Sequence, residues 1–280
     1  MESGLWTINA PELSDRDLSS IARLVYNACG INLHEGKRAL VAARLQKRLR
    51  HGGFQSFRQY IRYVRADETG RELTALLDAI ATNHTSFFRE PRHFDFFTRT
   101  VLPPLVERTG PMSIWSAGCA TGEEPYTIAM LLTERLGTGA GGRVRLLATD
   151  LSTKALATAD AGVYKSLKLS ELPPGFDKYF VRGVRTQEGY VRVTPALRAL
   201  VEFRWLNLVE ADDAPAAYDV IFCRNVMIYF DAPVQQRVIA SLERRLVPGG
   251  YLFISHSESL GAVEHGLQWV APSIYQRRRR

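Results

Sequence analysis

A glycine-rich stretch near the middle of the chain has the residues of a ligand-binding turn. Residues 112–116 form an apolar run typical of a strand, and residues 127–132 have a helical pattern. Between them, Gly118 and Gly122 permit a sharp bend and a close approach of the backbone to a ligand. The middle glycine of the GxGxxG pattern is absent, since Ala120 stands near its place. A tight connection without a ligand therefore stays open as an alternative.

A carboxylate follows the next apolar run. Asp150 comes directly after residues 145–149, which we predict to be a strand. In nucleotide-binding folds an acid at this place accepts hydrogen bonds from ribose hydroxyls. An aspartate before Leu151 and Ser152 also suits a helix cap, and that alternative stays open. Together with the glycine-rich turn, Asp150 favours an adenosyl or dinucleotide ligand.

The charges that follow the glycines discriminate between these ligands. Glu123 and Glu124 stand at the start of the predicted helix, where the helix dipole would otherwise attract an anion. Two carboxylates at this place would repel a pyrophosphate. S-adenosylmethionine carries an amino group and a sulfonium centre, so its charge fits this turn and that of NAD does not.

The residues before about position 80 have the apolar period of helices. Ser14 with Asp17 resembles a capping box, and Gly30 suits the end of the first helix. Its apolar stripe recurs at helical spacing and comprises Leu18, Ile21, Leu24, Val25 and Ala28. We predict a second helix over residues 37–50, with Val41, Leu45 and Leu49 buried. The helix should end at residues 51–53 (HGG).

Two more helices complete this region. Ser56 with Gln59 predicts the cap of a third helix, and a fourth has its apolar positions at Leu73, Leu76, Leu77 and Ile80. We therefore expect residues 1–80 to be an all-α N-terminal domain.

After Pro111 short apolar runs alternate with helical patterns. The runs at 112–116, 145–149, 219–223 and 251–255 predict parallel strands. Strands separated by helices imply a doubly wound α/β sheet, whose ligand lies at the carboxyl ends of the strands. Residues 190–193 and 200–204 alternate with period two around a proline-containing turn, which predicts a small antiparallel insertion at about 175–205. Residues 246–254 have the pattern of a helix end, a turn and a strand, which is widespread among methyltransferases of the nucleotide-binding fold. An ordinary helix-to-strand connection is nearly as compatible with this pattern.

The composition is that of a globular protein. Of 280 residues, 46% are hydrophobic and 23% are charged, which excludes a disordered chain. No apolar run reaches ~18 residues, and residues 1–4 lack the pattern of a secretory signal, so we expect a cytoplasmic protein without membrane insertion. Cys29, Cys119 and Cys223 are widely spaced, without a CxxC pair or nearby histidine ligands, and we expect no metal.

The net charge of +7 is unevenly distributed. Residues 277–280 are all arginine, a tail compatible with simple solvation. More informative is the stretch 37–65, which has no acid and nine basic residues: Lys37, Arg38, Arg44, Lys47, Arg48, Arg50, Arg58, Arg62 and Arg65. Such a field of one sign favours an acidic partner, although a solvated surface stays open.

Two strings of residues resemble a known family. Residues 81–90 (ATNHTSFFRE) and 223–230 (CRNVMIYF) are similar to the corresponding segments of the CheR-type chemotaxis receptor methyltransferases. The resemblance extends through the glycine-rich turn and through residues 205–208 and 256–259, and so covers nearly the whole chain. It implies a helical N-terminal domain, a linker with a lead-in helix over about 81–110, and a Rossmann-like methyltransferase domain over 111–280 that carries a small antiparallel β-subdomain.

The resemblance also implies an activity and its residues. The reaction would be methyl transfer from S-adenosylmethionine to glutamate side chains of a methyl-accepting chemotaxis receptor, giving methyl esters and S-adenosylhomocysteine. Arg89 and Tyr229 would stand closest to the transferred methyl group. The implied cofactor pocket comprises Asn83, Thr85, Arg89, Gly118, Glu123, Asp150, Asn207, Leu208, Arg224 and Asn225. Caps at Asn83 and Thr85 and a core role for Tyr229 are the plainer alternatives; His84, His93 and His256 receive no catalytic role.

The implied partner matches the basic stretch. Arg44, Lys47 and Arg48 would face the acidic, cytoplasmic helical region of a receptor or receptor-like protein, and we expect a monomer. A nucleic-acid methyltransferase is the main rival, because basic residues also neutralise phosphates, but stacking aromatics are missing from the stretch until Phe54. A catalytically idle S-adenosylmethionine-binding regulator is the second. The sequence does not identify the receptor or its methylated glutamates.

Overall fold

The structure, a computed structural model, describes residues 11–210 and 217–279. The described chain falls into two compact units that divide between Ala81 and Thr82. Residues 1–4, whose composition argued against a secretory signal, lie outside the described part. Among the described helices, none is both long and apolar enough to cross a membrane.

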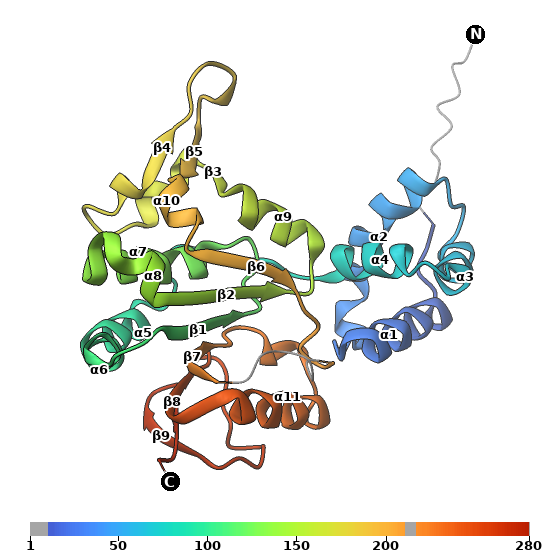
Figure 1. The fold of residues 1–280 in the computed structure, drawn as a ribbon. Helices are drawn as coiled ribbons and strands as arrows, with labels where there is room; N and C mark the ends of the chain where they lie inside the picture. The colour runs from blue at the N-terminus through green and yellow to red at the C-terminus, as the bar shows by residue number, and fades with distance from the viewer. Residues whose placement is uncertain (1–10, 211–216, 280) are drawn as a thin grey trace. The chain divides into compact units, whose positions relative to one another are not determined.

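The first unit is built from four helices, whose bounds are α1 Asp15–Cys29, α2 Arg38–Gly52, α3 Phe57–Ala66 and α4 Arg71–Ile80 (Figure 1). The predicted caps are confirmed, since Ser14 Oγ accepts from the amide of Asp17 and Ser56 Oγ from that of Gln59, each at 3.2 Å. Gly30 ends α1 in the left-handed region with φ 72°. Local sequence signals therefore set the helix boundaries here.

The helices of the first unit bury the predicted apolar stripes. Ile21 and Val25 of α1 and Val41 and Leu45 of α2 are fully buried. Each such side chain contributes about 1.5–3 kcal/mol by leaving water. Between α2 and α4 the core also contains an ion pair, because Arg48 holds the buried carboxylate of Glu72 with two hydrogen bonds, one of them 2.7 Å long.

We predict that Arg48→Ala lowers the free energy of unfolding of this unit by about 1–2 kcal/mol, since it leaves a buried carboxylate without its cation. The value is at the low end for a buried pair because the Arg48 side chain is itself 35% exposed. Urea denaturation followed by circular dichroism measures the change. The double variant Arg48→Met with Glu72→Gln should recover part of the loss, and equal stability of Arg48→Ala and wild type would show that the pair contributes nothing.

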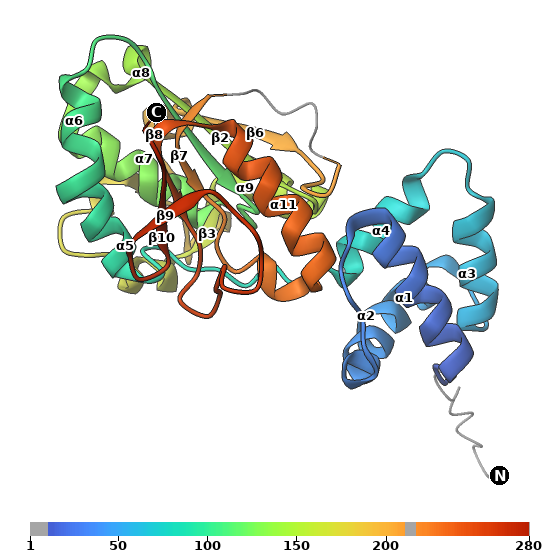
Figure 2. The same cartoon turned by 90° about the horizontal axis from the view of Figure 1, so that it is seen from below.

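The second unit contains a seven-stranded sheet in the order β6-β2-β1-β7-β8-β10-β9 (Figures 1 and 2). The first five are parallel, and β10 and β9 are antiparallel additions. The strands are β1 Met112–Ala117, β2 Val144–Asp150, β6 Val201–Trp205, β7 Tyr218–Phe222, β8 Leu246–Phe253, β9 Leu267–Ala271 and β10 Ile274–Arg277. The helices between them are α7 Glu123–Leu136, α8 Ala140–Arg143, α9 Thr153–Ala161, α10 Pro195–Arg198 and α11 Ala232–Arg245. The expected doubly wound α/β fold is confirmed.

The central strands are buried on both faces. Every residue of β7 is buried, and Ile114 and Trp115 of β1 are fully buried. Parallel strands covered by helices on both sides need such continuous apolar runs, which is why residues 112–116 and 219–223 could be recognised in the sequence. These strands give the site a rigid base.

One prediction about the insertion is wrong. Residues 200–204 do not pair with 190–193, because β6 lies beside β2 in the main sheet, with Asp150 opposite Trp205. The small antiparallel sheet consists instead of β3 Val163–Lys165, β5 Tyr190–Val193 and β4 Phe180–Arg182, in that order. The error has a physical cause: β6 is an edge strand with one exposed face, so it has the same two-residue period as a hairpin strand.

The segment before β1 belongs to the second unit. It comprises α5 Pro91–Phe96, a π-helical turn Phe97–Val101 and α6 Leu102–Glu107. Phe94, Phe97 and Leu102 are buried in the same core as the sheet. The chain from Thr82 onward is therefore part of the second unit, and this segment contributes buried side chains to its core.

Candidate active site

The glycine-rich turn connects β1 to α7 and lies at the carboxyl end of the sheet. Gly118 and Gly122 have φ values of 84° and 96°, which glycine adopts without strain. A Cβ on Gly118 would come within 2.4 Å of Val226, and one on Gly122 within 2.8 Å of Ala159. Both glycines are therefore required by the protein's own packing as well as by the bend.

Asp150 ties this turn to the end of β2. Its Oδ2 accepts from the Ala120 amide and its Oδ1 from the Ser152 amide, each at 2.8 Å. The N-cap of the following helix α9 is Ser152, so Asp150 is not itself the helix cap. A carboxylate has about four acceptor positions, so these two bonds are compatible with ribose hydroxyls as further donors.

The two glutamates after the glycines have different surroundings. Glu124 accepts from Ser116 Oγ at 2.7 Å and from Arg224 Nη1 at 2.9 Å. Glu123 is buried, its Oε2 accepts from Thr121 Oγ1 at 2.6 Å, and Lys168 Nζ lies 3.4 Å from its other oxygen. Burial raises the pKa of Glu123. In the described structure the cation beside this buried carboxylate is the protein's own Lys168, and contact of Glu123 with a cationic group of the cofactor stays a prediction.

The remaining implied cofactor residues lie on loops of the second unit. Asn207 and Leu208 follow β6, and Leu206 is bonded through its amide to the Asp150 carbonyl at 3.1 Å. Asn83 and Thr85 precede the lead-in helix, and the Thr85 carbonyl accepts from Lys168 Nζ at 2.9 Å. Lys168 therefore links this loop to Glu123. These donors and acceptors suit the amino, carboxylate and ribose groups of S-adenosylmethionine.

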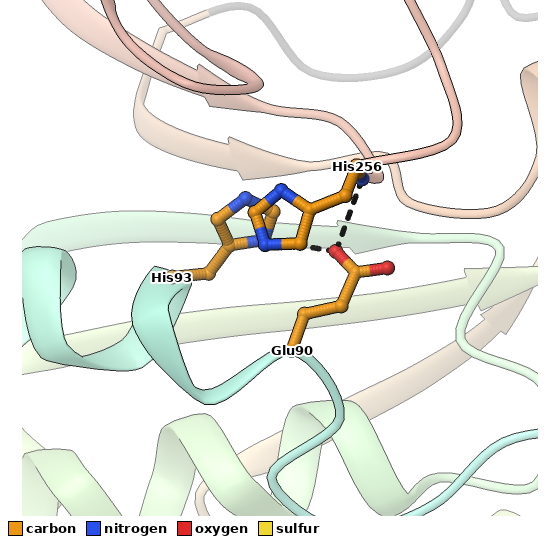
Figure 3. Close-up of side chains that lie close together, drawn as sticks. All are labelled: Glu90, His93 and His256. Atoms are coloured by element: carbon orange, nitrogen blue, oxygen red, sulfur yellow. Dashed lines mark hydrogen bonds and ion pairs between the residues drawn. The ribbon is translucent and has the colours of Figure 1, made fainter.

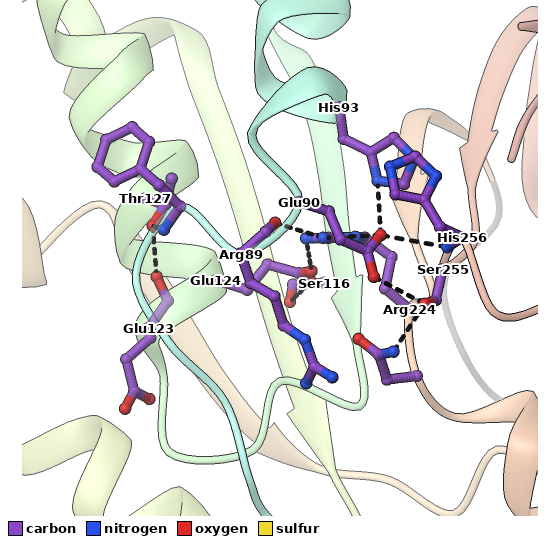
Figure 4. A network of polar contacts seen from close by, with 12 residues as sticks. Arg89, Glu90, His93, Ser116, Glu123, Glu124, Thr127, Arg224, Ser255 and His256 are labelled. Atoms are coloured by element: carbon purple, nitrogen blue, oxygen red, sulfur yellow. Dashed lines mark hydrogen bonds and ion pairs between the residues drawn. The ribbon is translucent and has the colours of Figure 1, made fainter. Parts of the chain in front are cut away.

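Arg89 stands on the same loop, just before α5. Its side chain is half-buried, and Nη1 donates to the His84 carbonyl at 2.9 Å. The Arg89 carbonyl in turn accepts from Arg224 Nη2. Figure 4 shows the Arg89 side chain pointing away from the carboxylate of Glu90. The guanidinium is thus placed beside, and outside, the buried network that holds its backbone.

The loop after β7 carries Arg224, Asn225 and Tyr229. Arg224 is buried, and its guanidinium contacts two carboxylates. Asn225 Nδ2 donates to Ser255 Oγ at 2.7 Å. Tyr229 is half-buried in the short 3-10 helix Met227–Tyr229. The structure therefore brings Arg224 into contact with the Arg89 loop, whereas for Tyr229 it fixes only the backbone position.

Glu258 is a site residue that the sequence argument missed. Its carboxylate accepts from the amides of Ser255, Asn225 and Met227, at 2.7, 3.1 and 2.8 Å. Burial raises the pKa of Glu258, and these amide donors act against that rise. Glu258 belongs to the family-like string at 256–259, but no local sequence pattern connects this residue to Asn225 and Met227, which lie about 30 positions earlier.

Glu90, His93 and His256 form a further cluster (Figure 3), with possible ligand atoms within 4.8 Å of one another. His93 Nδ1 lies 3.3 Å from Glu90 Oε2, and Arg224 Nη2 lies 3.2 Å from the same oxygen. A divalent cation at this place would face the guanidinium at close range. The cluster is better described as a packed extension of the Arg224 network.

The three implied partner-binding residues lie on α2 in the first unit. Arg44 donates to the carbonyls of Ile80 and Ala81, and Arg48 holds Glu72, so both cations have partners within the unit. Lys47 is exposed. Apart from Lys47, the exposed charge of the basic stretch therefore comes from other positions: Lys37 and Arg50, and Arg58, Arg62 and Arg65 on α3.

We predict that Asp150→Ala weakens S-adenosylmethionine binding about tenfold, or about 1.4 kcal/mol, because acceptors for the ribose hydroxyls are lost. Titration calorimetry measures the affinity. Ser152→Ala removes the cap of α9 at the same turn and is the matched control, expected to lower stability and leave affinity within about twofold. Unchanged affinity in Asp150→Ala would remove Asp150 from the site.

Comparison with known proteins identifies the family of this chain. The family described as CheR methyltransferase, SAM binding domain, matches residues 83–275, and the all-alpha domain of the same family matches residues 16–81. A chemotaxis protein methyltransferase of Klebsiella aerogenes is 40% identical over 94% of this chain and 90% of its own length. Proteins of the same description from Borreliella burgdorferi and Escherichia coli are 37% and 38% identical, over 93% and 94% of this chain and 94% and 91% of their own lengths. The chain therefore belongs to the CheR methyltransferase family and is an S-adenosylmethionine-dependent methyltransferase.

Proposed function

We propose that this protein methylates ionised glutamate side chains on the cytoplasmic helical region of a chemotaxis receptor, giving glutamyl methyl esters. The observation that carries the proposal is the placement of Arg89 on a loop that is hydrogen-bonded to α7, the helix that begins at Glu123, and to Arg224, which follows β7. Two carboxylates suit a cationic cofactor, and a part-exposed guanidinium suits an anionic acceptor. Membership of the CheR family supports both assignments.

The chemistry asks for positioning and not for a general base. When bound, S-adenosylmethionine supplies an electrophilic methyl group, and a glutamate carboxylate is already ionised and nucleophilic at neutral pH. Holding the acceptor oxygen in line replaces a bimolecular encounter, which contributes on the order of 7–11 kcal/mol to lowering a barrier. In this proposal Arg89 orients the carboxylate through charge-assisted hydrogen bonds, and Tyr229 completes the wall near the methyl group.

Receptor recognition is assigned to the basic surface of the first unit. Arg44, Lys47 and Arg48 supply charge there, and the inward bonds of Arg44 and Arg48 leave Lys47 and Arg50 as the more exposed cations of α2. Acidic residues around a methylated glutamate would complement this field. A monomer acting in the cytoplasm, without nucleic acid, completes the proposal.

The proposal is tested by the chemical lability of the product. The protein is incubated with S-adenosylmethionine that carries a tritiated methyl group and with membranes that contain a chemotaxis receptor. A carboxyl methyl ester releases the label as methanol in mild base, whereas a methylated nucleic-acid base or amine retains it. Base-stable label on nucleic acid would favour the rival enzyme, and no incorporation at all would favour the idle regulator.

We predict that Lys47→Glu with Arg50→Glu raises the KM for receptor about threefold to tenfold and leaves cofactor affinity intact, because exposed charges act over a Debye length of about 8–10 Å. Rising salt should produce part of the same effect in wild type. Arg16→Glu with Arg23→Glu on α1 changes the net charge equally and is the control. If the KM for receptor is the same in the two double variants, the charges of the basic stretch are simply solvated and do not bind the receptor.

A further inference from the structure

The backbone on either side of Arg89 is strained. Phe88 and Glu90 have φ values of 50° and 58°, in the left-handed region that large side chains rarely adopt. Such a conformation is energetically costly and persists only where surrounding contacts fix it. Phe88 and Glu90 flank Arg89, which is proposed to orient the acceptor carboxylate, so other contacts must keep both residues in this conformation.

On the Phe88 side, the holding contact comes from helix α7. The Phe88 amide donates to Thr127 Oγ1 at 3.2 Å, and that hydroxyl donates to the Glu123 carbonyl at 2.8 Å. On the Glu90 side, the carboxylate accepts from Ser255 Oγ at 2.7 Å and from the His256 amide at 3.3 Å. Both ends of the loop are therefore fixed to elements of the sheet edge (Figure 4).

Arg224 connects these contacts into one network. Its side chain is 2% exposed; Nη1 binds Glu124 at 2.9 Å, and Nη2 binds the Arg89 carbonyl and lies 3.2 Å from Glu90 Oε2. Glu124 is bonded onward to Ser116 of β1. Burial alone would raise the pKa of Glu90, but the Arg224 charge and the Ser255 hydrogen bond lower it, so the pair is ionised at neutral pH.

These contacts occupy Nη1 and Nη2 of the Arg224 guanidinium with the protein itself, whereas its buried Nε has no hydrogen-bond partner among the described residues. Nη1 and Nη2 face two carboxylates and a carbonyl, and the Phe94 ring packs 5.4 Å from the guanidinium carbon. A buried cation with two carboxylate partners is costly to disturb, because removal of one partner leaves an uncompensated charge. Such a cation is suited to fixing a loop.

We infer that Arg224 and Glu90 are a positioning pair that holds the strained Arg89 loop in the conformation for methyl transfer. The inference rests on the proposed role of Arg89 at the acceptor carboxylate. Arg224 acts on Glu90 and on the Arg89 carbonyl, and Arg89 acts on the substrate.

The test uses Glu90→Gln and Arg224→Lys in the full-length protein. Both variants should lower the single-turnover rate of receptor methylation at saturating cofactor at least about tenfold, or about 1.4 kcal/mol, with the calorimetric Kd for S-adenosylmethionine within about threefold of wild type. Glu243→Gln on α11, whose carboxylate accepts from the Gly266 amide at 3.1 Å, is the matched control and should keep the wild-type rate. Should Arg224→Lys fail to fold, Glu90→Gln alone decides, since it preserves shape.

A double-mutant cycle separates positioning from general weakening of the fold. In an Arg89→Ala background, Glu90→Gln should have almost no further effect, because the residue it positions is gone. Rates within about threefold of wild type for both single variants, or additive effects in the cycle, would overturn the inference. So would a cofactor Kd raised more than about tenfold in Arg224→Lys alone, which would make Arg224 a ligand. Failure of the proposed function is distinct, since wild type itself would then produce no base-labile label.

Discussion

Arg89→Lys will methylate the receptor almost as slowly as Arg89→Ala, both at least about 100-fold below wild type, which corresponds to about 2.7 kcal/mol. The reason is geometric. Arginine presents a planar fork of donors that can hold a carboxylate with two parallel bonds, whereas lysine presents a compact ammonium on a flexible stem. In this structure one nitrogen of the fork donates to the His84 carbonyl, which fixes the plane of the guanidinium. A lysine retains the charge but loses this anchor.

Single-turnover rates at saturating cofactor and receptor isolate the methyl-transfer step. The matched control is Arg92→Lys, the same charge-conserving substitution at an exposed arginine three positions further along the chain. It should keep the wild-type rate. A rate for Arg89→Lys within about threefold of wild type would mean that charge alone suffices, and the positioning role of the guanidinium would have to be abandoned.

The elements that the sequence predicted well are those with local causes. Ser14 and Ser56 sit at helix starts because their hydroxyls satisfy amides three residues later, a contact contained within one turn. The strand at 219–223 is buried on both faces and is therefore apolar throughout, apart from Asp219, which Arg108 pairs at 2.7 Å. Signals of this kind need no knowledge of the rest of the fold.

The failure at residues 200–204 shows the limit of periodicity. An alternating pattern reports that one face of a strand is exposed, and says nothing of which strand lies beside it. The partner of β6 is β2, more than 50 residues earlier, and the β-subdomain lies between them. Chain proximity favoured a hairpin, and the sheet order overruled it.

The sequence indicated candidate ligand-binding residues but not the residues that support them in the fold. Asp150 and Glu123 could be placed because each follows a recognisable strand or turn. Glu90 and Glu258 could not, because their partners are distant in sequence: Glu90 meets Ser255, 165 positions away, and Glu258 meets Asn225, 33 positions away. Supports of this kind depend on the tertiary fold, and only the family resemblance drew attention to the strings that contain them.

Acid will destabilise the methyltransferase unit by about 3 kcal/mol between pH 7 and pH 4, through the single residue His93. His93 is 1% exposed and packs between the rings of Phe253 and His256, at centroid distances of 5.7 and 4.4 Å. Burial, followed by the Arg224 charge, lowers the pKa of His93 to about 4, although Glu90 acts in the opposite direction. The imidazole is therefore neutral in the folded protein at neutral pH.

The sign follows from proton binding in the two states. An unfolded histidine titrates near ~6.5, so between that pH and about 4 the unfolded chain binds the proton and the folded chain does not. Stability is complete above this window and is lost as the pH falls through it. About 2 kcal/mol should be gone by pH 5. Because the folded pKa of Glu90 is lowered, its own loss comes at lower pH. Burial raises the pKa values of Glu123 and Glu258, which act in the opposite direction, so the contribution of His93 is isolated by comparison with a variant that lacks it.

Urea unfolding at pH 7 and pH 5, followed by the fluorescence of the buried Trp115, measures the difference for the second unit. In His93→Leu the loss of stability on going from pH 7 to pH 5 should be smaller than in wild type by about 2 kcal/mol, whatever the variant's absolute stability, because no buried imidazole remains to be protonated. His51→Gln, at an exposed position of the first unit, should keep the wild-type difference. If His93→Leu loses as much stability on acidification as wild type, protonation of His93 is not the cause and the acid sensitivity must arise at the carboxylates.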